Sequence, residues 1–205
     1  GGGDCADFLI LKIDPNGDVI WQNIYGIPGS HDLGYRVQEV SDGSFLCGGR
    51  SQSFGSGGSD FWAFKINSGG NLVWQKAYGG TSNDEFSSMQ VTSDDGAILT
   101  GSTGSFGNVS NDAWIFKIDT NGDIVWQKIF GGIGSDGGYV VSNQGLNIGI
   151  TSSSYGAGDS DMVIIKTDVG GNIPGCNLIQ NSNATPQNTD ATAVATNVSI
   201  SNTSA

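Results

Sequence analysis

The sequence predicts an all-β protein built from repeated four-stranded antiparallel units. The segment KIDTNGDIVWQKIFGG, residues 117–132, has near-copies starting at Lys12 and Lys65 and a divergent copy starting at Lys166. Asn-Gly and Asp-Gly pairs, which favour tight hairpin turns, separate short runs of β-branched and aromatic residues. No segment combines helical periodicity with helix caps, so no helix is expected.

The copies recur with a nearly constant period. Trp74 and Trp126 are 52 residues apart, and the extra residue before the first complete copy lies in the loop that contains His31. Such regular self-similarity is typical of repeat architectures. The same spacing of 52 residues separates Asp60 from Asp112, and also Asp32, Asp84 and Asp136 from one another.

Each unit is expected to contain four short strands. In the second complete unit these strands are residues 84–92, 97–103, 112–119 and 123–132. A repeated four-stranded unit of about 50 residues is typical of a β-propeller, in which like sheets bury one another's faces. Residues expected to fill the spaces between neighbouring blades are Trp21, Trp62, Trp74, Trp114 and Trp126.

One lysine recurs in every copy between flanking acids. Lys117, for example, lies between Asp112 and Asp119. We expect these lysines to form structural ion pairs whose aliphatic stems pack between the blades. The set is Lys12, Lys65, Lys117 and Lys166.

The repeat has a specific consensus, D-x-W-x-x-K-x-D-x-x-G-x-x-x-W-Q-K-x-x-G-G-x-x-x-D, followed by a D-G turn and G-x-T-x-S-F-G. This pattern resembles the SBBP-type β-propeller repeats of secreted bacterial and archaeal proteins over about residues 4–176. The resemblance implies the fold, and it implies no particular activity because that family is largely uncharacterised. The last copy departs from it, since residues 172–176 read NIPGC where Trp is expected, as in a unit that ends such an array.

The sequence divides into a propeller domain, residues 1–176, and an extended tail, residues 177–205. The domain holds about three and a half blades, because residues 8–25 supply only the last two strands of the first blade. An open array leaves unpaired strand edges. Three resolutions remain open: the chain is part of a longer propeller, the tail completes the first blade, or another copy supplies the missing strands.

The tail has two alternatives, a disordered linker or an extended strand docked on an exposed edge. Three of its asparagines begin N-x-S/T sequons, as does one in the repeat region. We expect a glycan at some of these positions, which are Asn108, Asn183, Asn197 and Asn202. A disulfide between Cys5 and Cys176 would join the two ends of the array and leave Cys47 as a buried free thiol.

The composition excludes several classes of partner. The net charge of −12 argues against nucleic acid and against anionic membrane surfaces. No apolar run of about 18 residues occurs, so no membrane-spanning helix is expected. No signal peptide is visible and the chain does not begin with Met, which favours a processed product or a fragment. Abundant Gly, Ser, Thr and Asn with few lysines favour a secreted or cell-surface location.

One face of the array is expected to collect two repeated elements. The first is an aromatic loop residue, Phe54, Phe106 or Tyr155, and the second is the acid that opens the following strand, Asp32, Asp84 or Asp136. An aromatic ring beside carboxylates is a common arrangement for sugar binding. In the alternative interpretation the rings plug the loop ends and each acid caps its turn.

Calcium is a weaker possibility at two acidic turns of the sequence. The turn ligands would be Asp14, Asn16, Asp18, Asp119, Asn121 and Asp123. Calcium wants about six to eight oxygen ligands, so tight hairpin turns explain these five-residue segments better. No other cofactor is expected.

We expect no enzymatic activity, because His31 is the only histidine and the acids are repeated equivalents. The sequence therefore predicts a non-catalytic extracellular structural or adhesive module. It is expected to self-assemble into a filament or surface layer through its open edges and tail. The alternative is a lectin-like carbohydrate-binding propeller, and a carboxylate-based glycoside hydrolase is a remote third.

Overall fold

The computed structural model describes residues 6–108, 110–142, 147–156, 159–173, 179–180, 187–188 and 192–195. These residues form an all-β structure of four antiparallel sheets, here named A to D, and none of them lies in a helix. Thirteen strands are six to eight residues long and three others are shorter. The all-β prediction is therefore confirmed, and no helix in the described part of the chain could span a membrane.

The sheets follow one another along the chain. Sheet A contains β1 (Phe8–Ile13), β2 (Val19–Gly26) and β16 (Thr192–Ala195). Sheet B contains β3 (Asp32–Glu39), β4 (Phe45–Ser51), β5 (Asp60–Ile66), β6 (Leu72–Tyr78) and β15 (Gln187–Asn188). Sheet C contains β7 (Asp84–Val91), β8 (Ala97–Thr103), β9 (Asp112–Ile118), β10 (Ile124–Phe130) and β14 (Ile179–Gln180). Sheet D contains β11 (Asp136–Ser142), β12 (Asn147–Ser152) and β13 (Asp161–Lys166).

Sheets B and C are consecutive hairpins, as the repeat predicted. Their strands lie side by side in the order β3-β4-β5-β6 and β7-β8-β9-β10. An irregularity recurs between the first two strands of sheets B, C and D, at Tyr35, Ser87 and Tyr139. Each is a β-bulge, which adds one residue to the strand and strengthens its twist.

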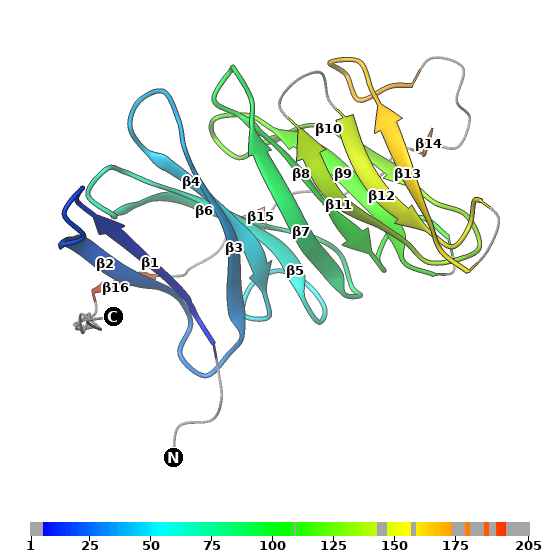
Figure 1. Cartoon of the computed structure of the whole chain (residues 1–205). Helices are drawn as coiled ribbons and strands as arrows, with labels where there is room; N and C mark the ends of the chain where they lie inside the picture. The colour runs from blue at the N-terminus through cyan, green and yellow to red at the C-terminus, as the bar shows by residue number, and fades with distance from the viewer. Residues whose placement is uncertain are drawn as a thin grey trace, which may run out of the picture.

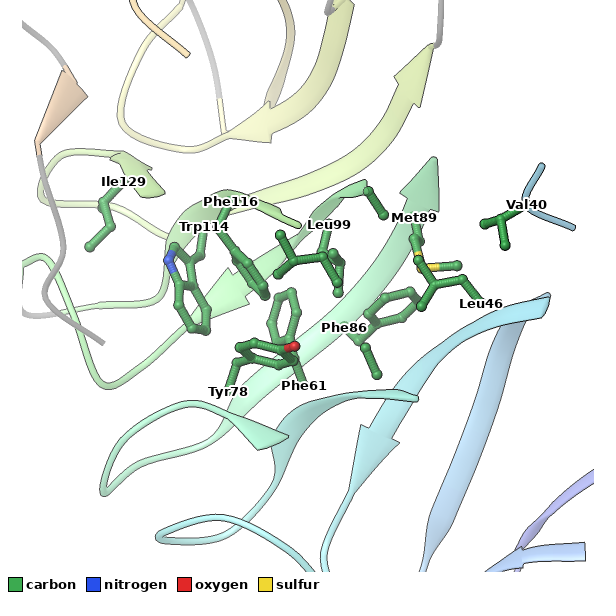
Figure 2. Packing of buried hydrophobic residues seen from close by; sticks show 13 residues of the cluster. Val40, Leu46, Phe61, Tyr78, Phe86, Met89, Leu99, Trp114, Phe116 and Ile129 are labelled. Carbon is green, nitrogen blue, oxygen red and sulfur yellow. The ribbon is translucent and has the colours of Figure 1, made fainter. Parts of the chain in front are cut away.

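Adjacent sheets pack face to face, and the aromatic residues of the repeat fill the space between them. Figure 2 shows this for sheets B and C, where Phe61 and Trp114 point toward each other with ring centroids 5.0 Å apart. Phe86 of β7 also contacts Phe61, at 5.7 Å. Similar clusters join sheet A to sheet B and sheet C to sheet D. A sheet therefore buries both of its faces only where it has a neighbouring sheet on both sides.

The tryptophans fill the positions expected of them in two ways. Trp62 and Trp114 are fully buried between sheets. Three others lie on the last hairpin strands and donate their indole N–H groups to a turn of the next sheet. The acceptors of Trp21, Trp74 and Trp126 are the carbonyl oxygens of Ser68, Thr120 and Val169, at 2.9–3.0 Å.

The expected ion pairs of the repeated lysines use different acids from those that flank them. Lys117 pairs with Asp94 at 2.6 Å, and Lys65 pairs with Asp42 at 2.9 Å. Both acids lie in the turn between the first two strands of the same sheet. The flanking acids take other partners. Asp112 lies at the opposite end of β9 from Lys117 and accepts the Asn108 N–H, while Asp119 caps its own turn by accepting the Asn121 N–H.

The four sheets lie in the order A, B, C, D along a curved row, with A and D at opposite ends (Figure 1). No closed ring is detected among the described strands. The propeller therefore stays a prediction. At the two ends of the row, β1 and β13 are edge strands.

The tail returns along the outer edges of the sheets. β14 pairs with β10 of sheet C, β15 with β6 of sheet B and β16 with β2 of sheet A, all antiparallel. The three strands of the tail thus pair with sheets C, B and A, the reverse of the order in which these sheets occur along the chain. Of the two alternatives for the tail, these pairings favour the docked strand.

Candidate functional site

The repeated acids Asp32, Asp84 and Asp136 open the first strands of sheets B, C and D and are buried. In each case Oδ2 accepts a backbone N–H from the preceding loop, at 2.9–3.1 Å. The same oxygen accepts a serine hydroxyl from the aromatic loop, at 2.6–2.7 Å. These contacts are the turn-capping arrangement of the alternative interpretation.

The structure does bring the repeated aromatic residues to the same strand ends as these acids. Phe54 is 8 % exposed and packs on Trp62, with ring centroids 5.4 Å apart. Phe106 packs on Trp114 in the same way, at 5.2 Å. These contacts bury Phe54 and leave Phe106 half-buried, as expected of rings that plug the loop ends.

Tyr155, the third member of the set, is half-buried and contacts Phe130, with ring centroids 5.4 Å apart. Its hydroxyl donates to the Gly131 carbonyl oxygen at 2.8 Å. The tyrosine is therefore held by both ends of its side chain, and sugar binding at this face stays a prediction.

The turns considered for calcium are closed by their own hydrogen bonds. Asp14 Oδ1 accepts the backbone N–H groups of Asn16 and Asp18 at 2.8 and 2.9 Å, and these donors lower the pKa of Asp14. Asp119 makes the equivalent bonds to Asn121 and Asp123. Asp123 is in addition paired with Lys76, at 2.7 Å. The hairpin-turn interpretation accounts for all these contacts.

Several predicted positions lie outside the described residues, namely Cys5, Cys176, Asn183, Asn197 and Asn202. Asn108 is exposed, as a glycosylation site requires. Cys47 is a buried free thiol whose pKa is raised by burial, so it is protonated at neutral pH.

The sequence analysis missed a second set of acids, which opens the third strand of each sheet. Asp7 precedes β1, while Asp60, Asp112 and Asp161 begin β5, β9 and β13. A recurrent main-chain hydrogen bond of 2.6–2.7 Å places three of them, Asp7, Asp60 and Asp112, beside an acid of the first set. Its donors are the N–H groups of Asp32, Asp84 and Asp136, and its acceptors are the carbonyl oxygens of Ala6, Ser59 and Asn111.

Three pairs of acidic side chains result, one at each junction between sheets. The pairs are Asp7 with Asp32, Asp60 with Asp84, and Asp112 with Asp136. Their spacing in the sequence, 24 or 25 residues, is the signal that could have revealed them.

Burial and like charge act together at these pairs. Burial and, as a smaller cause, the neighbouring Asp84 carboxylate together raise the pKa of Asp60 to about 7. Burial also raises the pKa of Asp112, with Asp136 as a further cause. At the first junction burial and the Asp32 carboxylate raise the pKa of Asp7, while the nearby His31 lowers it.

In the described residues, no group of three or more His, Cys, Asp or Glu side chains is placed to hold a metal ion. A site at these junctions would therefore use two carboxylates. No protein-family model matches the chain, and no curated protein matches its sequence. The resemblance to SBBP-type repeats stays a prediction.

Proposed function

We propose that this chain is a non-catalytic, extracellular structural module that associates with further copies of itself through its two terminal sheets. In this proposal the four sheets are blades of the β-propeller type, joined in an open row. The hairpin order of sheets B and C, their recurrent bulges and the repeated packing between sheets support this interpretation.

The observation that carries the proposal is the exposed apolar face of sheet D. Met162 and Ile164 of β13 are 75 % and 74 % exposed. The residues at the same two positions of the other three sheets are at most 9 % exposed, because the next sheet covers them. They are Phe8, Ile10, Phe61, Ala63, Ala113 and Ile115.

Sheet A exposes the opposite face of the repeat. Leu9, Leu11 and Ile13 of β1 are 39–51 % exposed. Their equivalents in sheets B and C are fully buried against the preceding sheet, and these are Trp62, Phe64, Ile66, Trp114, Phe116 and Ile118.

The two ends of the row therefore present the two halves of the interface that the protein already forms three times internally. A head-to-tail contact of this kind is heterologous, and it produces an open polymer when it does not close into a ring. Exposed apolar patches on a soluble protein commonly mark such contacts.

The tail would strengthen the contact between the terminal faces. Its strands bind outer edges through main-chain hydrogen bonds, a mode that depends little on sequence. The same strands could pair with the edges of a second copy. The terminal faces would then provide apolar contact, and tail exchange would secure it.

The test is sedimentation velocity of the full chain over a range of concentrations. The wild-type protein is expected to gain mass with concentration. Met162→Lys/Ile164→Lys blocks one end, Leu11→Lys/Ile13→Lys blocks the other, and each is expected to be monomeric. An equimolar mixture of the two is expected to form a dimer, because one unblocked end of each kind remains.

The control is Val73→Lys/Val125→Lys, which changes residues that are 56 % and 58 % exposed on sheets B and C. It is expected to associate like the wild type. A wild-type protein that stays monomeric throughout, or an end-blocked variant that still assembles, would overturn the proposal.

A further inference from the structure

We propose that the carboxylate pairs Asp60 with Asp84 and Asp112 with Asp136 each bind a hard divalent cation of the calcium class, buried between adjacent sheets. The proposal is independent of self-association, because it concerns the junctions inside one chain. It also differs from the calcium sites considered at the hairpin turns, which are exposed.

The first observation is that both acids of each pair have an unpartnered buried oxygen. Oδ1 of Asp60, Asp84, Asp112 and Asp136 is inaccessible to solvent and has no hydrogen-bond partner. All four residues are at most 3 % exposed. Buried carboxylate oxygens are nearly always satisfied, so four such atoms at two equivalent places indicate a missing ligand.

The second observation is that Oδ2 of Asp84, Asp112 and Asp136 is held by donors, which favour the ionised form of these acids. Asp84 Oδ2 accepts from the Gly80 N–H and the Ser105 hydroxyl. Asp136 Oδ2 accepts from the Gly132 N–H and the Ser154 hydroxyl.

Their partners across the junction are held by main-chain donors. Asp112 Oδ2 accepts from the Asn108 N–H at 2.7 Å, and Asp60 accepts from the Ser56 N–H. In the absence of positive charge, burial raises the pKa of Asp60 and Asp112, so both carboxylates of a pair can be ionised at one buried place only with a cation between them.

Among the described residues, no basic side chain supplies that charge. The four ion pairs formed by Lys and Arg use Asp42, Glu85, Asp94 and Asp123, none of which belongs to the two carboxylate pairs. A divalent cation would neutralise both carboxylates of a pair, whereas one proton would neutralise a single carboxylate.

Glycine stands directly against the carboxylates, whose oxygens occupy the space that a Cβ would fill. A Cβ at Gly79 would lie 1.7 Å from Asp60 Oδ1 and 2.7 Å from Asp84 Oδ2. A Cβ at Gly131 would lie 2.0 Å from Asp112 Oδ1. The ligand set is oxygen only, which suits calcium, and main-chain carbonyls or water would complete its coordination.

The first junction is an internal comparison. There the Ser51 hydroxyl donates to Asp32 Oδ1 at 2.5 Å, so only Asp7 Oδ1 is unpartnered. We expect this junction to bind the cation weakly or not at all, and the chain to hold two ions.

The test uses the full chain, stripped with EDTA and then titrated with calcium chloride. Isothermal titration calorimetry is expected to give two ions per chain, and the thermal midpoint is expected to rise with calcium. Magnesium is expected to act more weakly because it demands a tighter octahedral site. Asp60→Asn and Asp112→Asn are each expected to remove one ion, and the double variant both.

The matched control is Asp14→Asn/Asp119→Asn at the exposed turns, which is expected to keep both ions. Loss of calcium binding in this control would show that the ions bind at the turns, and it would overturn the proposal. A second result would also overturn the proposal: a wild-type chain that binds no calcium and becomes more stable in EDTA as the pH is lowered from 7.5 to 5. That result would mean that each carboxylate pair shares a proton. If a variant fails to fold, equilibrium dialysis of the wild-type chain with calcium still decides the number of ions.

Discussion

Tyr78 donates its buried phenolic hydroxyl to the carbonyl oxygen of Gly122 at 2.8 Å, and this bond joins sheet B to the last hairpin turn of sheet C. We predict that Tyr78→Phe lowers the free energy of unfolding by about 1–3 kcal/mol, because the buried carbonyl loses its donor. Urea denaturation would measure this. The control Tyr35→Phe, at an exposed tyrosine, should leave the unfolding free energy unchanged; equal effects of the two variants would contradict the prediction.

The same bond recurs one sheet earlier and is absent one sheet later. Tyr25 donates to Gly70 at 2.6 Å, but the third equivalent residue is Phe130, which has no hydroxyl. A small cavity borders Phe130 and Gly171, the residue equivalent to Gly70 and Gly122.

We therefore predict that Phe130→Tyr raises the free energy of unfolding by about 0.5–1.5 kcal/mol, since the new hydroxyl can donate to the Gly171 carbonyl. Urea denaturation under identical conditions is the measurement. Phe116→Tyr is the contrast, because that ring is fully buried among other rings and the new hydroxyl should destabilise the protein. A loss of stability in Phe130→Tyr would show that the cavity does not admit the hydroxyl.

The strand positions could be predicted because turns and periodicity are local. The expected strand 84–92 is β7, Asp84–Val91, and the Asn121–Gly122 turn ends β9 as predicted. Local residues decide these features, since Gly122 adopts φ 78°, a backbone conformation that glycine takes readily because it has no Cβ. The repeat then transfers each assignment to the equivalent strands.

The contacts between units were not predictable in the same way. The partner of Lys117 is Asp94 rather than a flanking acid, because neighbouring strands bring their hairpin turns together. The pairing of Asp60 with Asp84 depends on the packing of two sheets, because β5, β6 and the loop before β7 separate these residues in the sequence. The pairing of β15 could not be predicted from the sequence, because Gln187 and Asn188 are both polar and show no alternation of apolar and polar residues.

A glycine in the middle of β8 allows two strands to approach closely. A Cβ at Gly101 would lie 2.0 Å from the Glu85 carbonyl oxygen and 2.5 Å from the Phe61 ring. Since the backbone cannot move aside cheaply, we predict that Gly101→Ala lowers the free energy of unfolding by about 1–3 kcal/mol.

The control for this prediction is Gly69→Ala. A Cβ at Gly69 would meet only ordinary contacts at 3.4 and 3.5 Å, and its effect should stay within about 0.5 kcal/mol. Thermal and urea denaturation of both variants is the check. Similar losses in the two would mean that general chain entropy, rather than the close approach at Gly101, causes the effect.

The ion pair between Lys117 and Asp94 predicts a change of stability with pH. The Lys117 ammonium, helped by the Thr92 hydroxyl, lowers the pKa of Asp94 from 3.8 to about 2. Because the folded-state pKa lies below the unfolded value, the pair stabilises the protein fully above about pH 4 and loses this contribution as the pH falls through about 2.

Lys117→Met should therefore lower the thermal midpoint slightly at pH 6. Between pH 4 and pH 2 the thermal midpoint of this variant should fall by less than that of the wild type. Thermal denaturation at a series of pH values would show this. Lys12→Met is the control, since Lys12 lies 5.3 Å from the Phe45 ring centroid and makes a cation–π contact instead. An acid profile that is unchanged in Lys117→Met would contradict the assignment.

The docked tail predicts a localised effect of truncation. β16 pairs with residues 23–26 of β2, and residues 23–25 therefore have paired strands on both sides. In a chain that ends at residue 178, the N–H groups of residues 23–26 that face the tail lose their partners and should exchange with deuterium faster. Hydrogen–deuterium exchange with mass spectrometry would detect this, with β8 as the internal reference because β7 and β9 flank it. Faster exchange across the whole chain would indicate that the tail stabilises the fold globally, and unchanged exchange in β2 would mean that the tail does not hold that edge.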